Sequence, residues 1–181
     1  MSTYEELVVN GYRLLHEQDV DQALDISREL QQLDALATEG YVLEGEVMQK
    51  LNQFDHCVRL FSKALEIDPE AARVYNLRGY ALMQKERVEE ALGDFERAIE
   101  LGDLPEAHRN LVLCRVLEEK GGEAITYLIN RIRKDPRDVE NWILMGDIMK
   151  RGGQADKARS YYEQALKMDP DNEYAQRQLE E

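Results

Sequence analysis

The chain has 181 residues and a formal net charge of −14, with 43% hydrophobic and 33% charged residues. This balance permits a packed core beneath a charged surface and argues against wholesale disorder. The negative charge disfavours binding to nucleic acids or to anionic membrane surfaces, because both depend on lysine and arginine. Residues 1–71 carry 5 basic and 15 acidic residues. This excess is typical of a solvated acidic face, and the alternative is that it attracts a basic segment of a partner.

The remaining composition indicates a reducing compartment. The first residues do not form a basic leader followed by an apolar run, and no stretch approaches the length of a membrane span. Cys57 and Cys114 form neither a CxxC pair nor a disulfide framework. We therefore expect a cytoplasmic protein without membrane insertion.

A pattern of two helices recurs along the chain. Asp-Pro steps begin at Asp68, Asp135 and Asp169, and each step follows one apolar helical segment and precedes another. The last two steps are 34 residues apart, and the first two are 67 apart, one short of twice that period. Cut at this period, the chain consists of five repeats followed by a closing helix: 4–37, 38–71, 72–104, 105–138, 139–172 and then 173–181.

Four places in each repeat hold the same kind of residue. The eighth and twentieth places are mostly small, which lets two antiparallel helices approach closely. The fourth and twenty-fourth places are mostly bulky, and these side chains fill the space that is left. The residues in chain order are Leu7, Tyr41, Tyr75, His108 and Trp142 at the fourth place; Gly11, Gly45, Gly79, Val112 and Gly146 at the eighth; Ala23, Cys57, Ala91, Ala124 and Ala158 at the twentieth; and Ser27, Phe61, Phe95, Leu128 and Tyr162 at the twenty-fourth.

This pattern resembles the tetratricopeptide repeat, which follows W-x2-L-G-x2-Y, then A-x3-F, then proline. The resemblance implies an all-α fold, a right-handed α-solenoid of five tandem helix-turn-helix units plus a short C-terminal closing helix. One helix pair cannot bury both its faces, so each pair would pack on the next. We therefore expect residues 1–181 to form a single solenoid domain.

The resemblance also implies a peptide-binding groove on the exposed stripe of the first helices. In this family that stripe contacts an extended or helical peptide of a partner protein. Many of the matching residues here are apolar, and exposed apolar patches mark partner sites. An amphipathic helix docked in the groove is the fitting mode of recognition. The predicted groove residues are Val8, Tyr12, Leu15, Val42, Glu46, Arg73, Asn76, Tyr80, Met83, Arg109, Leu113, Val116, Leu117, Ile143, Asp147 and Lys150.

The fourth repeat departs most from the pattern. Val112 replaces the usual glycine, and Arg115 and Arg131 stand where a hydrophobic residue and an alanine are usual. Larger side chains at packing positions push helices apart locally. The hypothesis is that this repeat is a looser joint that either opens the groove or forms a self-association contact.

No motif predicts catalysis, a cofactor or a metal site. His56 and Cys57 are adjacent, and neighbouring residues of a helix diverge by about 100°, so they do not form a nucleophile and base. Cys57 replaces an alanine of the other repeats, which predicts a small core residue, and His108 takes a ring-filling place. The glycine pairs at 121–122 and 152–153 lack the lysine and hydroxyl of a phosphate-binding loop. We expect no enzyme activity.

The leading interpretation is an adaptor or scaffold for other proteins. A self-assembling structural subunit is a second interpretation, in which Tyr161, Tyr162 and Tyr174 would form an interface between copies. A chaperone-like assembly factor for secreted or pilus-type substrates is a third, which rests on analogy within the superfamily. The partner is therefore a protein or peptide, or a second copy of the chain.

Overall fold

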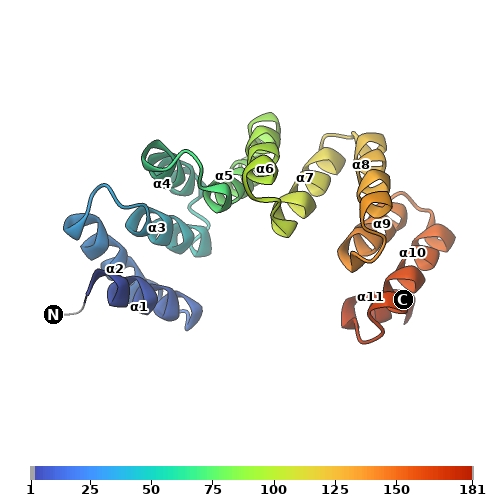
Figure 1. Cartoon of the computed structure of the whole chain (residues 1–181), viewed down its shortest axis with the longest axis horizontal. Helices are drawn as coiled ribbons and strands as arrows, with labels where there is room; N and C mark the ends of the chain where they lie inside the picture. The colour runs from blue at the N-terminus through green and yellow to red at the C-terminus, as the bar shows by residue number, and fades with distance from the viewer. Residues whose placement is uncertain (1–2, 181) are drawn as a thin grey trace. The chain divides into compact units, whose positions relative to one another are not determined.

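The protein is all-α. The computed structural model describes residues 3–180, which form eleven helices and no strand. Consecutive helices are joined by short turns (Figure 1). The helices are α1 (Tyr4–His16), α2 (Val20–Leu33), α3 (Glu39–Lys50), α4 (Phe54–Ile67), α5 (Ala72–Gln84), α6 (Val88–Gly102), α7 (Pro105–Leu117), α8 (Gly121–Lys134), α9 (Val139–Arg151), α10 (Ala155–Met168) and α11 (Glu173–Glu180).

The prediction of an all-α fold built from helix pairs is confirmed. α4 shows why these segments become helices, since its buried residues Cys57, Phe61, Ala64 and Leu65 follow the spacing of one helical face. The odd-numbered helices α1 to α9 begin within one residue of the predicted repeat starts.

Aspartate ends several second helices by the same device. Asp34, Asp68 and Asp135 each follow the last residue of a helix, and each side chain accepts a hydrogen bond from the backbone N–H two residues later, at 2.8 to 3.0 Å. Such a bond offers the backbone a turn in place of another helical step. Two Asp-Pro steps, those at Asp68 and Asp135, therefore mark helix ends through this bond, and Asp169 of the third step also directly follows a helix.

The turn inside each pair has one residue in the left-handed backbone conformation. It falls at the fifteenth place of every repeat, where the φ angle lies between 56° and 71°. Glycine adopts this conformation without strain, whereas other residues carry a steric penalty. The five residues are Gln18, Asn52, Glu86, Glu119 and Gly153.

Glycine at the eighth place makes room for a ring of the second helix. A Cβ atom added to Gly45 would lie 2.4 Å from the ring of Phe61, closer than atoms can pack. Corresponding distances in the third and fifth repeats are 2.7 Å and 2.5 Å. The absent side chain therefore sets how closely the two helices of these pairs approach.

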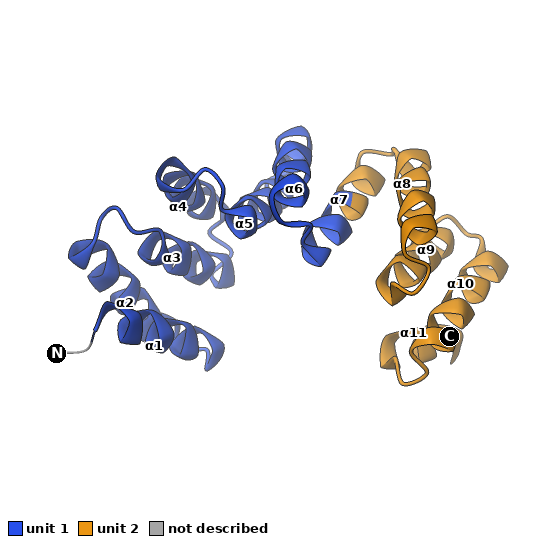
Figure 2. Ribbon diagram, in the orientation of Figure 1, with its two compact units in different colours: residues 1–111 blue, residues 112–181 orange. Residues whose placement is uncertain are grey.

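The chain divides into two compact units, residues 1–111 and residues 112–181 (Figure 2). In unit 1 each helix from α1 to α5 contacts the next one along the chain, and α1 also contacts α3. In unit 2 the contacts run from α8 to α9, α10 and α11. Each unit has its own apolar core, with Phe61 in the first and Tyr162 in the second. One continuous solenoid over the whole chain stays a prediction.

Candidate functional site

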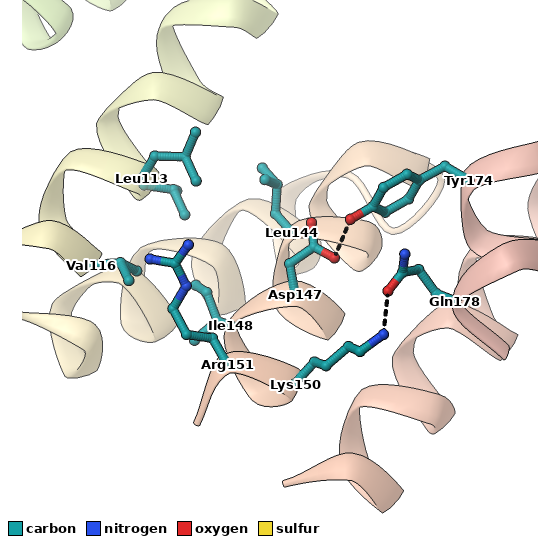
Figure 3. Close-up of a pocket in the computed structure, with 10 residues that line it drawn as sticks. Leu113, Val116, Leu144, Asp147, Ile148, Lys150, Arg151, Tyr174 and Gln178 are labelled. Carbon is teal, nitrogen blue, oxygen red and sulfur yellow. Dashed lines mark hydrogen bonds between the residues drawn. The ribbon is translucent and has the colours of Figure 1, made fainter. Parts of the chain in front are cut away.

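A pocket in unit 2 lies between the end of α7, the exposed face of α9 and the closing helix α11 (Figure 3). Its volume is about 400 Å³, within the range of about 300 to 1,000 Å³ typical of ligand sites. We call it the α9 pocket, and it is lined by Val112, Leu113, Val116, Leu144, Asp147, Ile148, Lys150, Arg151, Tyr174 and Gln178.

Helical spacing places these residues together. On α9, Leu144, Asp147, Ile148 and Arg151 lie at intervals of three and four residues, so they share one face. The same rule brings Tyr174 and Gln178 to one side of α11, four residues apart. The pocket is thus the meeting of three regular helical faces.

One wall of the α9 pocket is apolar and open to solvent. Leu113 keeps 37% of its surface exposed, and Val116 and Ile148 are half-buried. Leu144 is buried and forms part of the base. This wall leaves apolar surface that a hydrophobic side chain of a partner could cover.

The other wall is polar and ties α11 to α9. The hydroxyl groups of Tyr162 and Tyr174 both donate hydrogen bonds to Asp147 Oδ1, at 2.7 and 2.9 Å. Lys150 Nζ donates to Gln178 Oε1 at 2.9 Å, and Figure 3 shows this bond beside the one from Tyr174. The Asp147 carboxylate is therefore already used as an acceptor inside the molecule.

Arg151 supplies the pocket with an available cation. Its side chain is exposed, and it forms no ion pair or hydrogen bond with any residue between 3 and 180. In Figure 3 its guanidinium group points toward Val116, at the edge of the apolar wall. A guanidinium group presents paired donors that fit a carboxylate. The α9 pocket therefore combines an apolar surface with an anion-binding group.

The predicted groove residues of unit 1 are largely engaged with one another. Arg73 Nη2 donates to Glu46 Oε1 at 2.5 Å, and its guanidinium carbon lies 5.7 Å from the centre of the Tyr12 ring. Burial raises the pKa of the Glu46 carboxyl above its usual value, and Arg73 reduces this rise. Tyr12, Glu46 and Arg73 form one cluster on α1, α3 and α5.

The other predicted groove residues of unit 1 differ in their contacts and in their exposure. Asn110 Nδ2 donates to Asn76 Oδ1 at 2.9 Å, and the Tyr80 ring packs edge-on against Phe54 with centroids 6.5 Å apart. Val8 packs against the core of unit 1 and Met83 is half-buried, whereas Arg109 is exposed.

Three predicted groove residues are buried. Leu15, Val42 and Ile143 are all buried in the cores of their units, so the expectation that they offer apolar surface to a partner is wrong. A first helix is covered on more than one side, as α3 is by α1, α2 and α4. Its buried stripe is therefore wider than the single face that we assumed.

The expected tyrosine interface also requires a correction. Tyr162 is buried against Gly146 and its hydroxyl binds Asp147, so it cannot contact a second copy. Tyr161 is half-buried beside Trp142, with ring centroids 6.1 Å apart. Of the three tyrosines, only Tyr174 is exposed.

The described residues also show where metal-ligating, membrane-spanning and thiol groups stand. Between residues 3 and 180 no group of three or more His, Cys, Asp or Glu side chains could hold a metal ion. Within the same range, no helix combines the length and the apolar character needed to cross a bilayer. Cys57 and Cys114 are buried thiols, and His108 is a buried ring.

Comparison with known proteins identifies the repeats. Two models described as "Tetratricopeptide repeat" match residues 43–105 and 139–172, which together are more than half of the chain. The chain belongs to the tetratricopeptide repeat family. Proteins of this family act by binding other proteins.

The relatives include a receptor and solved tetratricopeptide structures. The human mitochondrial import receptor subunit TOM70 is 30% identical over 120 residues, which cover 62% of this chain and 20% of TOM70. The chain thus spans about a fifth of the length of this curated relative. PilW, described as a type IV pilus biogenesis factor, has a TM-score of 0.78 at 20% identity, over 92% of this chain and 78% of PilW. YrrB, described as having an unusual peptide-binding site, has a TM-score of 0.67 at 22% identity, over 95% of this chain and 89% of YrrB. At these identities the solved structures show the tetratricopeptide fold alone.

The α9 pocket contains four of the predicted groove residues, Leu113, Val116, Asp147 and Lys150. Leu117 is exposed outside it. The sequence prediction missed the wall formed by α11, because the tetratricopeptide stripe is defined on first helices only. The sequence did contain one signal for this wall, because Tyr174 and Gln178 are four residues apart and so lie on one face of the closing helix.

Proposed function

We propose that this tetratricopeptide protein is an adaptor or scaffold that binds an extended peptide or an amphipathic helix of a partner protein and catalyses no reaction. The observation that carries the proposal is the α9 pocket, where the exposed Leu113 and the half-buried Val116 lie beside the guanidinium group of Arg151. Binding of protein partners is the common role of the family.

The pocket chemistry favours a segment with an aliphatic side chain next to a carboxylate. The aliphatic group would cover Leu113, Val116 and Ile148, and burying a side chain of leucine size contributes about 1.5 to 3 kcal/mol. The carboxylate would accept hydrogen bonds from Arg151, an interaction that is stronger than one between neutral groups. Asp147 is the one acid in the pocket lining, and the two cations beside it, Lys150 and Arg151, outweigh its charge.

The experiment begins by trapping the partner at the pocket. A photo-crosslinking residue, p-benzoylphenylalanine, is placed at position 113, and the crosslinked peptide is identified by mass spectrometry. The synthetic form of that peptide is then titrated against the chain by fluorescence anisotropy. Leu113→Glu should raise the dissociation constant by at least about tenfold, since it places a carboxylate in the apolar wall.

Leu33→Glu is the matched control. Leu33 lies on α2 in unit 1 and is 59% exposed, so this variant makes the same chemical change outside the pocket and should bind like the wild type. Circular dichroism should show equal helix content in both variants. Equal affinity of Leu113→Glu and wild type for the trapped peptide would refute the proposed site.

Self-association is the alternative that a solution measurement decides directly. Light scattering at several concentrations gives the mass of the particle, and a strict monomer removes this role. If the chain does associate, Tyr174→Ala tests whether the closing helix takes part, because Tyr174 is the one exposed tyrosine of the expected interface.

A further inference from the structure

A second groove lies in unit 1, away from the residues predicted to bind peptides. It has a volume of about 430 Å³ and runs between the second helices α2 and α4, with α3 at its base. We call it the α2–α4 groove. Its lining residues are Leu24, Arg28, Tyr41, Glu44, Met48, Leu51, Gln53, His56, Arg59, Leu60 and Lys63.

Each helix contributes one regular face to this groove. Leu24 and Arg28 are four residues apart on α2, and Arg59 and Lys63 are four residues apart on α4. From α3, three residues spaced by three and four positions line the groove, and Met48 among them is buried. These spacings align side chains on one face of a helix, so the groove is built from ordered helical surface.

The base and walls are largely apolar. Three of the apolar lining residues are half-buried, namely Leu24, Tyr41 and Leu60. Leu51 is a large apolar residue, yet it keeps 44% of its surface exposed. An aliphatic side chain of a ligand would cover this surface and remove it from water, which favours binding.

Cations surround this apolar base in a unit that is otherwise strongly acidic. Unit 1 has 11 basic and 23 acidic residues, a net charge of −12, yet the groove has Arg28, Arg59 and Lys63 against one carboxylate, that of Glu44. Glu44 Oε2 is already bound by Gln31 Nε2 at 2.6 Å. The local charge of the groove is therefore opposite in sign to the charge of its unit.

Two of these cations are available to a ligand. Arg28 and Arg59 are exposed, and neither forms an ion pair or hydrogen bond with a residue in the described range 3–180. Lys63 pairs with Glu66 at 2.9 Å, in an exposed contact between neighbouring turns of α4. Two guanidinium groups flanking an apolar base are suited to carboxylates that alternate with aliphatic side chains.

We propose that the α2–α4 groove is a second binding site, which takes an acidic peptide whose aliphatic side chains cover Leu24, Leu51 and Leu60 while its carboxylates bind Arg28 and Arg59. At physiological salt, charges more than about 8 Å away are largely screened, so a short peptide experiences mainly the cations of the groove. A polyanion such as nucleic acid or an anionic bilayer extends past the groove and meets the acidic surface of unit 1. This charge pattern selects a peptide as the ligand.

The probe is a short fluorescein-labelled peptide in which leucine and glutamate alternate. The titration is carried out on the full chain with Leu113→Glu, which places a carboxylate in the apolar wall of the α9 pocket, so that its result is independent of the proposed function. Arg28→Gln combined with Arg59→Gln should weaken binding by about tenfold for each guanidinium group removed, because each substitution removes charge-assisted hydrogen bonds to the peptide carboxylates.

Arg13→Gln combined with Arg97→Gln is the matched control, since both residues are exposed arginines of unit 1 outside the groove. It should bind the probe like its parent. The peptide with glutamine in place of glutamate should bind weakly to every variant, and so should the peptide with serine in place of leucine.

Several outcomes overturn the proposal. They are failure of the parent chain to bind the leucine–glutamate peptide, equal binding of the glutamine peptide, and equal loss in the control pair. Binding of phosphatidylserine vesicles that depends on Arg28 and Arg59 would also overturn it in favour of a membrane surface. Circular dichroism and urea midpoints equal to those of the parent chain would exclude misfolding of the variants.

Discussion

The side chain of Cys57 occupies a place where the other four repeats have alanine. Its Sγ lies 3.4 Å from the carbonyl oxygen of Gly45, across the seam between α3 and α4. Burial raises the pKa of this thiol to about 11, and the pKa of Cys114 also rises to about 11 for the same reason. Both thiols are therefore packing groups and poor nucleophiles at neutral pH.

The raised pKa of Cys57 predicts a loss of stability in alkaline solution. The unfolded thiol ionises near its ordinary pKa of 9.0 and the folded one near 11, so the contribution of the thiol is present below pH 9 and is lost as the pH rises toward 11. Between these values the wild type should lose roughly 2 kcal/mol more than Cys57→Ala, since one pKa unit corresponds to about 1.4 kcal/mol. Urea unfolding of both chains at a series of pH values measures this difference, and parallel pH profiles would contradict it.

Glycine at the eighth place predicts a second effect of single residues. In Gly45→Ala the new Cβ would overlap the Phe61 ring, and overpacking of this kind destabilises by about 1 to 3 kcal/mol. Gly93→Ala is the control, because an added Cβ at Gly93 on α6 meets nothing within 4 Å. That variant should gain about 0.5 to 1 kcal/mol from helix propensity. Thermal and urea unfolding should show opposite shifts, and shifts of the same sign would contradict the account of the seam.

At the scale of the element, the turn inside each helix pair repeats one backbone conformation whatever residue occupies it. Asn52 and Gly153 suit the left-handed region, whereas Gln18, Glu86 and Glu119 do not. The helices on either side therefore impose the conformation on those three residues. The turns contain local strain that a glycine would remove.

Glu86→Gly should accordingly stabilise the protein. Relief of the left-handed conformation contributes about 1 to 2 kcal/mol, and the greater freedom of glycine in the unfolded chain takes back about 0.5 to 1 kcal/mol. We expect a net gain of about 0.5 to 1 kcal/mol in the free energy of unfolding. Gly153→Ala should do the opposite, because Gly153 has a φ angle of 71°. A loss of stability in Glu86→Gly, measured by urea titration, would show that its side chain matters more than its backbone.

The helices could be predicted from sequence more fully than the site. Asp68 and Asp135 end helices through bonds to their own following backbone, which is local chemistry that a sequence displays. Burial of Leu15, Val42 and Ile143 depends instead on helices that are distant along the chain, and a single helical stripe does not contain that information. The pocket wall of α11 was missed for the same reason.

For the whole molecule, the division into two compact units coincides with the least regular repeat. The boundary between Leu111 and Val112 falls inside α7, where valine replaces the usual glycine of the eighth place. The partner place on α8 is Leu128, where the second, third and fifth repeats have aromatic rings. Gly121 and Gly122 begin α8, and an added Cβ at either would meet nothing within 4 Å.

Hydrogen exchange should therefore be fastest, among the paired helices, in α7 and α8. Fewer matched packing residues and two glycines lower the free energy of local opening. Mass spectrometry of exchanged peptides compares these helices with α3 and α4, which have the regular glycine and ring. Gly122→Ala should slow exchange in α8 without changing α3. Equal protection of α7–α8 and α3–α4 would remove the idea of a looser joint.

The seam of the fifth repeat has an implication for how such repeats diversify. Tyr162 fills the space above Gly146 as a ring and also delivers a hydroxyl to Asp147. The second repeat has Phe61 at the same place and Glu46 where Asp147 would be. A single added oxygen atom on that phenyl ring would offer a carboxylate a new donor with no change of backbone. Repeats that share one backbone arrangement can thus gain or lose a hydrogen bond through a single atom, while the supporting helices keep their positions.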